Sequence, residues 1–232
     1  GSVIIEDNKI VEVTNSNYAV IGAQVIDAKG LYLVPGGIEI HVHGGGGRDF
    51  MEGTEEAFTV AVNAHMKHGT TSIFPTLSSS SVPMIEAAAE ACTNLMKDPN
   101  SPILGLHLEG HYLNMAMAGG QIPEYIKDPD PEEYIPIIEK WPCIKRWDVA
   151  PELPGAIEMG KYLKSKGVLA SIAHTQAEYD DVHAAWEAGY THATHFYNAM
   201  PGFHKRREYK YEGTVESIYL HKDMTVEVVA DG

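Results

Sequence analysis

Two histidines separated by one residue are the first feature of this chain that could do chemistry. His41 and His43 end an apolar run that begins at Ile38, and four glycines follow them. In a β-strand, residues i and i+2 point to the same face, so both imidazoles can reach one ligand. Neutral imidazole is a common zinc ligand. The pair suggests part of a metal site, although two polar residues in a glycine-rich loop would look the same.

Three more residues of ligand type stand at the ends of later apolar runs. Glu109 follows 103–108, His174 follows 168–173, and His195 ends the run that starts at His192. A carboxylate buried at such a place is costly without a cation. Each residue alone could also be a surface glutamate or a buried, hydrogen-bonded histidine. Together they predict a metal site, with zinc as the first expectation, whose ligands are His41, His43, Glu109, His174 and His195.

The elements that must position these residues alternate along the chain from residue 38. Expected strands are 38–42, 70–74, 103–108, 144–149, 168–173, 192–196 and 225–229. Helix signals begin near residues 54, 81, 131, 155 and 180, and 198–224 gives no clear one. The alternation fits a doubly wound parallel sheet or a (β/α)₈ barrel. Because the candidate ligands all follow strand ends, which share one mouth only in a barrel, we expect an α/β, TIM-like barrel.

Residues 1–35 have a different pattern and are expected to form a small β domain. Strands are predicted at 3–6 and 9–13, and again at 24–27 and 31–34, with turns between the members of each pair. Pro35-Gly36-Gly37 marks the boundary to a barrel domain over 36–232. The barrel would have seven strands where eight are needed to close it. We therefore expect the chain to be truncated at its C-terminus, with the eighth strand missing.

Composition excludes several classes of protein. The 232 residues carry a net charge of −15 and a pI near 5.1, which argues against nucleic acid or an anionic membrane as partner. There is no apolar stretch of about 18 residues and no signal-peptide pattern at the N-terminus. Two cysteines cannot form a disulfide framework, so a reducing cytoplasm is expected.

The other histidines have less specific surroundings. His65, His68, His183 and His221 fall in or near expected helices and are predicted to be solvated. His111 and His204 lie in loops near the expected mouth, where they could touch a substrate. His107 shares a strand face with Glu109 and is expected behind the metal ligands. Arg206 and Arg207 form a basic pair that suits a phosphate or carboxylate, or is simply a solvated loop.

Several of these segments resemble a known family. Residues 34–44, VPGGIEIHVHG, resemble the opening barrel strand of the amidohydrolase superfamily. Within it, five later motifs resemble, in order, those of the N-acetylglucosamine-6-phosphate deacetylase family. They are LHLEG at 106–110, APE at 150–152, AHT at 173–175, ATHFYNAMP at 193–201 and ADG at 230–232. The ATHFYNAMP run is the most specific of them.

The resemblance implies roles for individual residues. Glu109, His174 and His195 match the primary metal ligands, and His41 with His43 match a pair that holds a second ion in some members. Positions implied to bind substrate are Gln121 (where many members have histidine), Asn198, the backbone of Ala199, and Arg206 or Arg207. No catalytic residue is expected within the chain, because the family's aspartate belongs to the eighth strand, beyond Gly232; Asp231 belongs to the seventh-strand motif.

The implied activity is hydrolysis of the acetamide of N-acetylglucosamine 6-phosphate to glucosamine 6-phosphate and acetate. The resemblance also implies a homodimer, and a β-sandwich of which 1–35 is only part. His111, in place of the usual proline, and the loop 207–213 depart from the family pattern. Two alternatives stay open. One is another amidohydrolase, dihydroorotase-like or aminoacylase-like, and the other is a non-catalytic protein that binds metal or sugar phosphate.

Overall fold

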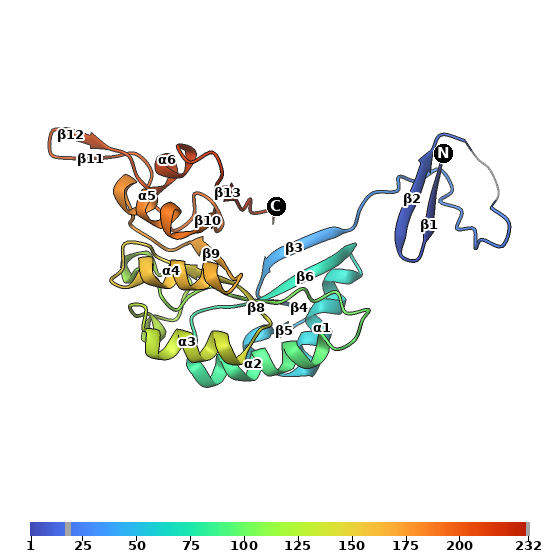
Figure 1. Ribbon diagram of the computed structural model, residues 1–232, viewed down its shortest axis with the longest axis horizontal. Coiled ribbons are helices and arrows are strands. Elements are labelled where there is room, and N and C mark those ends of the chain that lie inside the picture. Colours follow the sequence, from blue (N-terminus) through green and yellow to red (C-terminus); the bar gives the residue numbers. More distant parts are fainter. Residues whose placement is uncertain (17–19, 231–232) are drawn as a thin grey trace. The chain divides into compact units, whose positions relative to one another are not determined.

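The computed structural model describes residues 1–16 and 20–230 and divides into two compact units, Gly1–Pro35 and Gly36–Gly232 (Figure 1). In the first unit, β1 (Ser2–Glu6) and β2 (Lys9–Thr14) form an antiparallel hairpin. Asp7 and Asn8 make its turn with positive φ angles of 49° and 62°, which these residue types tolerate. The first predicted hairpin is therefore confirmed.

The second hairpin predicted in this unit, over 24–27 and 31–34, was wrong. Neither segment is a strand, and the apolar side chains from Val25 to Val34 are largely exposed. A turn bond from the Leu31 N–H to the Ala28 carbonyl forms at 2.9 Å, yet the flanking segments do not pair. A strand without a partner to pack against is not stable in water. The assignment of 1–35 to a β-sandwich stays a prediction.

The second unit is built on a sheet of seven parallel strands. Their spatial order is β13-β10-β9-β8-β7-β6-β3, which follows the sequence without a reversal. The strands are β3 (Gly37–Val42), β6 (Thr70–Leu77), β7 (Leu106–Leu108), β8 (Ile144–Val149), β9 (Leu169–Ile172), β10 (Tyr190–Ala193) and β13 (Thr225–Val226). A doubly wound sheet would reverse its order at a switch point, whereas a barrel does not. The curled sheet with its helices confirms a partial TIM-like barrel.

Helices connect the strands as the capping signals predicted. They are α1 (Glu55–Met66), α2 (Val82–Leu95), α3 (Pro131–Lys140), α4 (Ala156–Ser165) and α5 (Tyr179–Ala188). Thr54 begins α1 by accepting the Ala57 N–H at 3.2 Å, and Asp130 caps α3 in the same way. Gly189 ends α5 at a φ of 111°. Buried side chains such as Trp147 and Tyr190 fill the space between helices and sheet.

The segment that gave no clear helix signal contains two small elements. A hairpin of β11 (His204–Arg206) and β12 (Tyr209–Tyr211) precedes a six-residue helix, α6 (Thr214–Tyr219). Such a helix is too short to show a hydrophobic period. A two-residue hairpin, β4 (Gly44–Gly45) with β5 (Arg48–Asp49), follows His43, and 3₁₀ helices lie at Phe50–Glu52, Met115–Met117 and Pro123–Tyr125. Among the described residues, every helix is too short or too polar to cross a bilayer.

Candidate functional site

The five predicted ligands meet around one carboxylate. Glu109 directly follows β7, and only 3% of its surface is exposed. Its Oε1 lies 3.0 Å from Nε2 of His174 and 3.0 Å from Nε2 of His195. Its Oε2 lies 3.4 Å from Nε2 of His41 and 3.1 Å from Nε2 of His43. One glutamate therefore stands between two pairs of imidazoles, each pair facing a different oxygen.

The proton of His174 can be placed from its hydrogen bond. Its Nδ1 lies 2.7 Å from the carbonyl oxygen of Met117, which can only accept, so Nδ1 carries the proton. Its Nε2 lies 3.1 Å from Nε2 of His195, and both nitrogens face Oε1 of Glu109. When neither Nε2 carries a proton, the lone pairs converge and repel one another unless a positive charge lies between them. Two imidazole nitrogens and a carboxylate oxygen form a donor set that suits zinc and similar ions.

The second group has the same arrangement on the other side of Glu109. Nδ1 of His41 donates to Oε1 of Glu227 at 2.7 Å, so Nε2 is the ring nitrogen that faces Glu109 and would bind an ion. That nitrogen lies 3.3 Å from Nε2 of His43, whose own Nδ1 is 3.3 Å from Ser78 Oγ. In both groups, His41–His43–Glu109 and Glu109–His174–His195, the ligand atoms lie within 4.8 Å of one another. Each group could hold a metal ion.

The backbone turns sharply where two of these ligands stand. His174 and His195 have φ angles of 43° and 29°, in a region that non-glycine residues seldom adopt. Hydrogen bonds hold both turns, since the His174 carbonyl accepts the Asn114 N–H and the His195 carbonyl accepts the Asn198 N–H, both at 2.9 Å. Such conformations persist where the surroundings impose them, and they cluster at functional sites. Here they follow directly on the ends of β9 and β10.

The interior behind the centre lacks positive charge. Among the described residues, the buried side chains with a full charge are Arg146, Glu109, Asp148 and Glu227. These four buried side chains therefore carry one positive and three negative charges. Burial disfavours a charge on His41, but its contacts with Glu109 and Glu227 prevail and raise its pKa to about 10. Burial likewise opposes the charge of Glu109, and the four surrounding imidazoles nevertheless hold its pKa well below the usual value. The site attracts positive charge, which a divalent cation would supply.

Sequence reasoning did not single out Glu227, Arg146 and Asp148. Arg146 and Asp148 alternate within β8, and Glu227 follows β13, so polar residues at one face of apolar strands were the available signal. His107 lies behind the ligands, as expected. Its ring packs edge-on against His41 with centroids 4.9 Å apart, and its Nε2 is 3.0 Å from Oδ1 of Asp148. Burial lowers the pKa of His107 to about 4, so this imidazole is neutral near pH 7.

The residues expected to bind substrate lie in loops at this end of the sheet. Gln121 is buried and accepts the Ser79 N–H at 2.6 Å, and a Cβ added at Gly119 in the same loop would lie 3.5 Å from the His174 ring. Asn198 is exposed and donates to the His195 carbonyl at 3.1 Å. Ala199, with a φ of 52°, continues the same turn. These residues border the His174 and His195 side of the centre.

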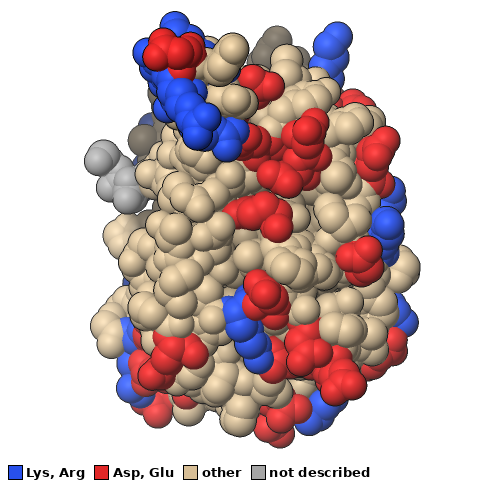
Figure 2. Space-filling view, turned by 90° about the vertical axis from the view of Figure 1, so that its left-hand side faces the viewer, with Lys and Arg blue, Asp and Glu red and all other residues tan. Residues whose placement is uncertain are grey.

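The two arginines lie on the β11–β12 hairpin and differ in their surroundings. Arg206 donates to Glu178 at 2.7 Å and stacks over the Tyr211 ring at 4.1 Å. Arg207 is exposed, with a φ of 54°, and has no ion-pair partner within 1–16 and 20–230. In Figure 2, which looks onto the side of the molecule that carries this hairpin, a cationic group near the top stands out on a surface that is mostly uncharged with scattered acidic patches.

Some expectations for the other histidines were wrong. His111 does not lie open at the mouth, because it is 1% exposed and its Nε2 lies 2.6 Å from Oε1 of Glu133. His221 is not solvated, because its Nδ1 donates to the Ser217 carbonyl at 2.8 Å and its Nε2 lies 3.1 Å from Nδ1 of His183. His65 is half-buried, and its Nε2 is 2.9 Å from the Gly44 carbonyl. Each of these imidazoles serves the packing of the barrel.

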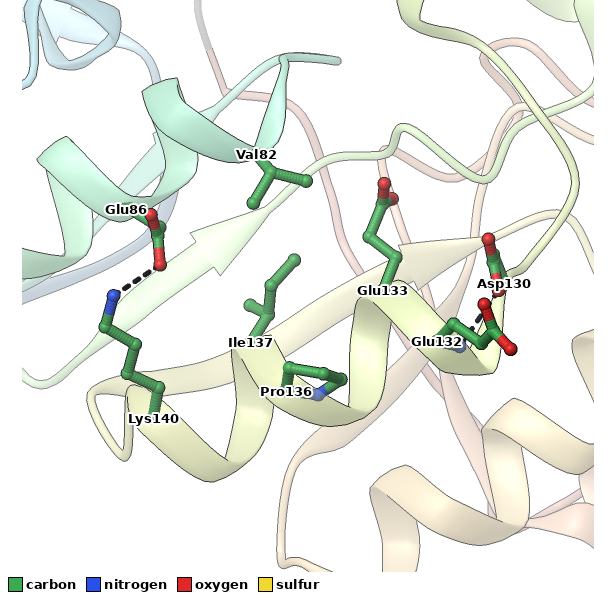
Figure 3. A pocket seen from close by; sticks show the side chains of 8 residues that line it. All are labelled: Val82, Glu86, Asp130, Glu132, Glu133, Pro136, Ile137 and Lys140. Carbon is green, nitrogen blue, oxygen red and sulfur yellow. Dashed lines mark hydrogen bonds and ion pairs between the residues drawn. The ribbon is translucent and has the colours of Figure 1, made fainter.

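A surface pocket of about 390 Å³ lies elsewhere, between α2 and α3 (Figure 3). Its lining residues are Val82, Glu86, Asp130, Glu132, Glu133, Pro136, Ile137 and Lys140. Three of its four carboxylates already have structural partners: Glu86 pairs with Lys140 at 2.5 Å, Asp130 caps α3, and Glu133 forms ion pairs with His111 and Lys127. We therefore do not consider this pocket a candidate active site.

A partial TIM-like barrel with histidine and glutamate ligands at its strand ends is the architecture of a metal-dependent hydrolase. Residues 32–230 match the sequence profile of the Amidohydrolase family, and the chain belongs to this family. Its members depend on metal, in accord with the two ligand groups.

Within this family, the chain is similar to several deacetylases of phosphorylated amino sugars. The chain is 31% identical over 234 residues to the N-acetylglucosamine-6-phosphate deacetylase of Lysinibacillus sphaericus, covering 98% of this chain and 58% of the relative. The crystal structure of the Pasteurella multocida N-acetylglucosamine-6-phosphate deacetylase superposes with a TM-score of 0.84 at 29% identity, over 92% of this chain and 55% of that one. A mutant of the Mycobacterium smegmatis enzyme in complex with N-acetyl-D-glucosamine-6-phosphate gives a TM-score of 0.78 at 31% identity, over 84% and 50%. The chain spans about half the length of the curated relatives it matches.

Proposed function

We propose that this chain carries the metal centre of an enzyme that hydrolyses the acetamide of N-acetylglucosamine 6-phosphate to glucosamine 6-phosphate and acetate. The observation that carries the proposal is the position of Glu109, whose two oxygens each face a pair of imidazole nitrogens. The relatives with this activity support the choice of substrate.

In this proposal His174, His195 and Glu109 hold one divalent ion, and His41 and His43 share Glu109 to hold a second. Zinc fits the donor set best, and Fe²⁺ is the second choice. An ion bound here would make a bound water acidic enough to attack near neutral pH and would polarise the acetamide carbonyl. Glu109 fixes the spacing of the imidazoles. Transfer of the proton to the leaving amine is assigned to the aspartate that the resemblance places on an eighth strand.

The phosphate of the substrate would be bound by the loops beside His195. Asn198 offers a side-chain amide, Ala199 a backbone N–H, and the hairpin Arg206 and Arg207. Arginine suits phosphate because its planar donors match two phosphate oxygens. Gln121 has its oxygen committed to Ser79 at 2.6 Å, so its amide nitrogen is the group that would reach the sugar. A homodimer and a cytoplasmic location are part of the same proposal; Cys92 and Cys143 are both free thiols, as a reducing compartment would keep them.

The test combines metal content with substrate preference. The purified protein is stripped with chelator, reloaded with zinc, and assayed for acetate release from N-acetylglucosamine 6-phosphate and from N-acetylglucosamine. We expect binding of at least one metal equivalent and, for turnover, a strong preference for the phosphorylated sugar. Better turnover of N-acyl amino acids or of dihydroorotate would replace this proposal with the other amidohydrolases. In a protein that also carries the eighth-strand aspartate, tight binding of metal and sugar phosphate without hydrolysis would favour the non-catalytic alternative.

A further inference from the structure

A buried ion pair lies directly behind the His41 side of the centre. Arg146, on β8, is 4% exposed, and one of its terminal nitrogens lies 2.7 Å from Oε2 of Glu227. Glu227 is 7% exposed, and its other oxygen accepts the Nδ1–H of His41 at 2.7 Å. A line of contacts therefore runs from Arg146 through Glu227 to His41, and it joins three separate strands of the sheet.

Arg146 is itself fixed by the barrel interior. Its Nε donates to Ser171 Oγ at 3.1 Å, and its terminal nitrogens donate to the Ile40 carbonyl at 3.2 Å and to Thr194 Oγ1 at 2.8 Å. These partners belong to or adjoin β9, β3 and β10. Because the guanidinium is planar and always charged, bonds to three strands leave it one orientation. Glu227 is thereby held against His41 rather than free to turn toward solvent.

Such a pair is expensive in the core and gives little stability in return. Removing two charges from water costs several kcal/mol for each ion, and apolar residues of similar size often serve as well. The effect of the Arg146–Glu227 pair falls on the imidazole of His41, which Glu227 contacts. A carboxylate on one nitrogen of a histidine fixes the proton there, orients the ring, and makes the other nitrogen a stronger ligand.

The other candidate ligands have different partners at the same position. His174 has the Met117 carbonyl at 2.7 Å, and His43 has the Ser78 hydroxyl at 3.3 Å. Nδ1 of His195 is buried and without a hydrogen bond among the described residues. Among these four histidines in the described part of the chain, His41 is therefore the one whose Nδ1 has a charged partner, the carboxylate of Glu227.

We propose that Glu227, held by Arg146, is a positioning residue for His41 that turns Nε2 of this histidine toward the second ion of the proposed centre. The inference rests on the proposed function, because it assumes that the Glu109 centre binds metal. It goes beyond that function in naming the residues behind His41 that secure the second ion. Without the carboxylate, the proton of His41 is free to move to Nε2, and the ligand atom is lost.

The experiment is a titration of the metal-free protein with Co²⁺ and with Zn²⁺. It reports the number of equivalents bound, the Kd of each and the visible absorption of bound Co²⁺. We expect about two equivalents in the parent protein. In Glu227→Ala the second equivalent weakens by roughly 10–100-fold, while the first keeps its Kd. Glu227→Gln, which retains an acceptor of the same size, restores part of this loss, and Arg146→Met weakens the second equivalent as well.

Two controls separate positioning from general damage. Glu187→Gln alters a carboxylate that also neighbours a histidine, His183 at 3.8 Å, but lies on the surface of α5; it should change neither equivalent. In a His41→Asn background, Glu227→Ala or Glu227→Gln should cause no further loss, because a residue that acts through His41 has nothing left to act on. Circular dichroism and the unfolding midpoint check that each variant folds, and the isosteric Glu227→Gln keeps the cycle usable if the alanine variant does not.

Each outcome decides something. Two equivalents with unchanged Kd values in Glu227→Ala overturn the inference. One equivalent in the parent protein, lost in His174→Asn but kept in His41→Asn, also overturns it while the proposed function stands with a single ion. No metal bound by a folded parent protein ends the proposed function itself.

Discussion

Trp147 on β8 donates its indole N–H to the carbonyl oxygen of Gly110 at 2.7 Å. Gly110 directly follows Glu109, so this bond ties the neighbouring strand to the loop that carries the central carboxylate. The indole is fully buried and stacks on Tyr112 with ring centroids 5.5 Å apart. The position of Glu109 therefore depends on a side chain that is not itself near any metal ligand in sequence.

Trp147→Phe should loosen Glu109 without touching the ligands. The phenyl ring keeps most of the packing but leaves the Gly110 carbonyl without its donor, at a cost of about 1–3 kcal/mol in the free energy of unfolding. Metal should bind more weakly to both groups, because they share Glu109. Urea unfolding and metal titration measure the two effects. Trp186→Phe, a half-buried tryptophan on α5, is the matched control, and equal effects in both variants would contradict the role of the Gly110 bond.

Glu109→Gln should impair both ligand groups together. The amide has the size of the carboxylate but lacks its charge, and its nitrogen presents donors where the imidazoles present lone pairs. We expect roughly 100-fold weaker binding of every metal equivalent. His174→Asn should weaken only the equivalent that uses His174 and His195. Isothermal titration of the two variants compares them, and loss of a single equivalent in Glu109→Gln would show that the carboxylate does not bridge.

Arg207 should contribute more than Arg206 to recognition of the phosphate. Arg206 is engaged by Glu178 and Tyr211, whereas Arg207 is exposed and without an ion-pair partner in the described part of the chain. A charged hydrogen bond contributes about 1.5–3 kcal/mol, so Arg207→Met should raise the KM for the phosphorylated substrate about 10–100-fold with little change in kcat. Arg206→Met is the paired variant. The reverse order of effects would assign the phosphate to Arg206.

The sequence predicted the barrel well because local signals agreed with the global fold. Caps such as Thr54 and the glycine at 189 begin and end helices whatever the tertiary contacts. The failures lie where tertiary contacts decide. Apolar residues at 24–27 and 31–34 looked like strands, but within 1–16 and 20–230 no strand pairs with them. The short helix α6 depends on its packing against α5 rather than on a hydrophobic period.

The candidate ligands were readable because each follows a strand and has a side chain that binds metal. The charged residues behind these ligands could not be predicted, because the contacts that give them a role form only when the sheet curls. Arg146 and Glu227 are distant in sequence and on strands that are not neighbours, so only the folded sheet brings them to 2.7 Å. His111 was misplaced for the converse reason. It follows the Glu109 motif in sequence, but the chain turns it inward to Glu133.

Glu133 should make the free energy of unfolding depend on pH in the acidic range. Its hydrogen bond from His111, opposed by burial and aided by Lys127 and Tyr112, lowers its pKa from 4.5 to about 2. A carboxyl group whose pKa is lower in the folded than in the unfolded state stabilises the fold above the unfolded pKa. That contribution disappears as the pH falls from about 4.5 to about 2. Glu133→Gln should therefore be less stable than the parent protein near pH 7, and the difference should shrink across this range.

Urea unfolding of the metal-free protein at several pH values measures the effect. The matched control is Glu132→Gln, which alters the exposed neighbour on the same turn of α3. It should differ little from the parent protein at any pH, because an exposed carboxylate without a buried partner has nearly the same environment folded and unfolded. The difference in unfolding free energy for Glu133→Gln could instead stay constant down to about pH 2. The variant would then lose side-chain packing rather than the ionic interaction of Glu133 with His111 and Lys127.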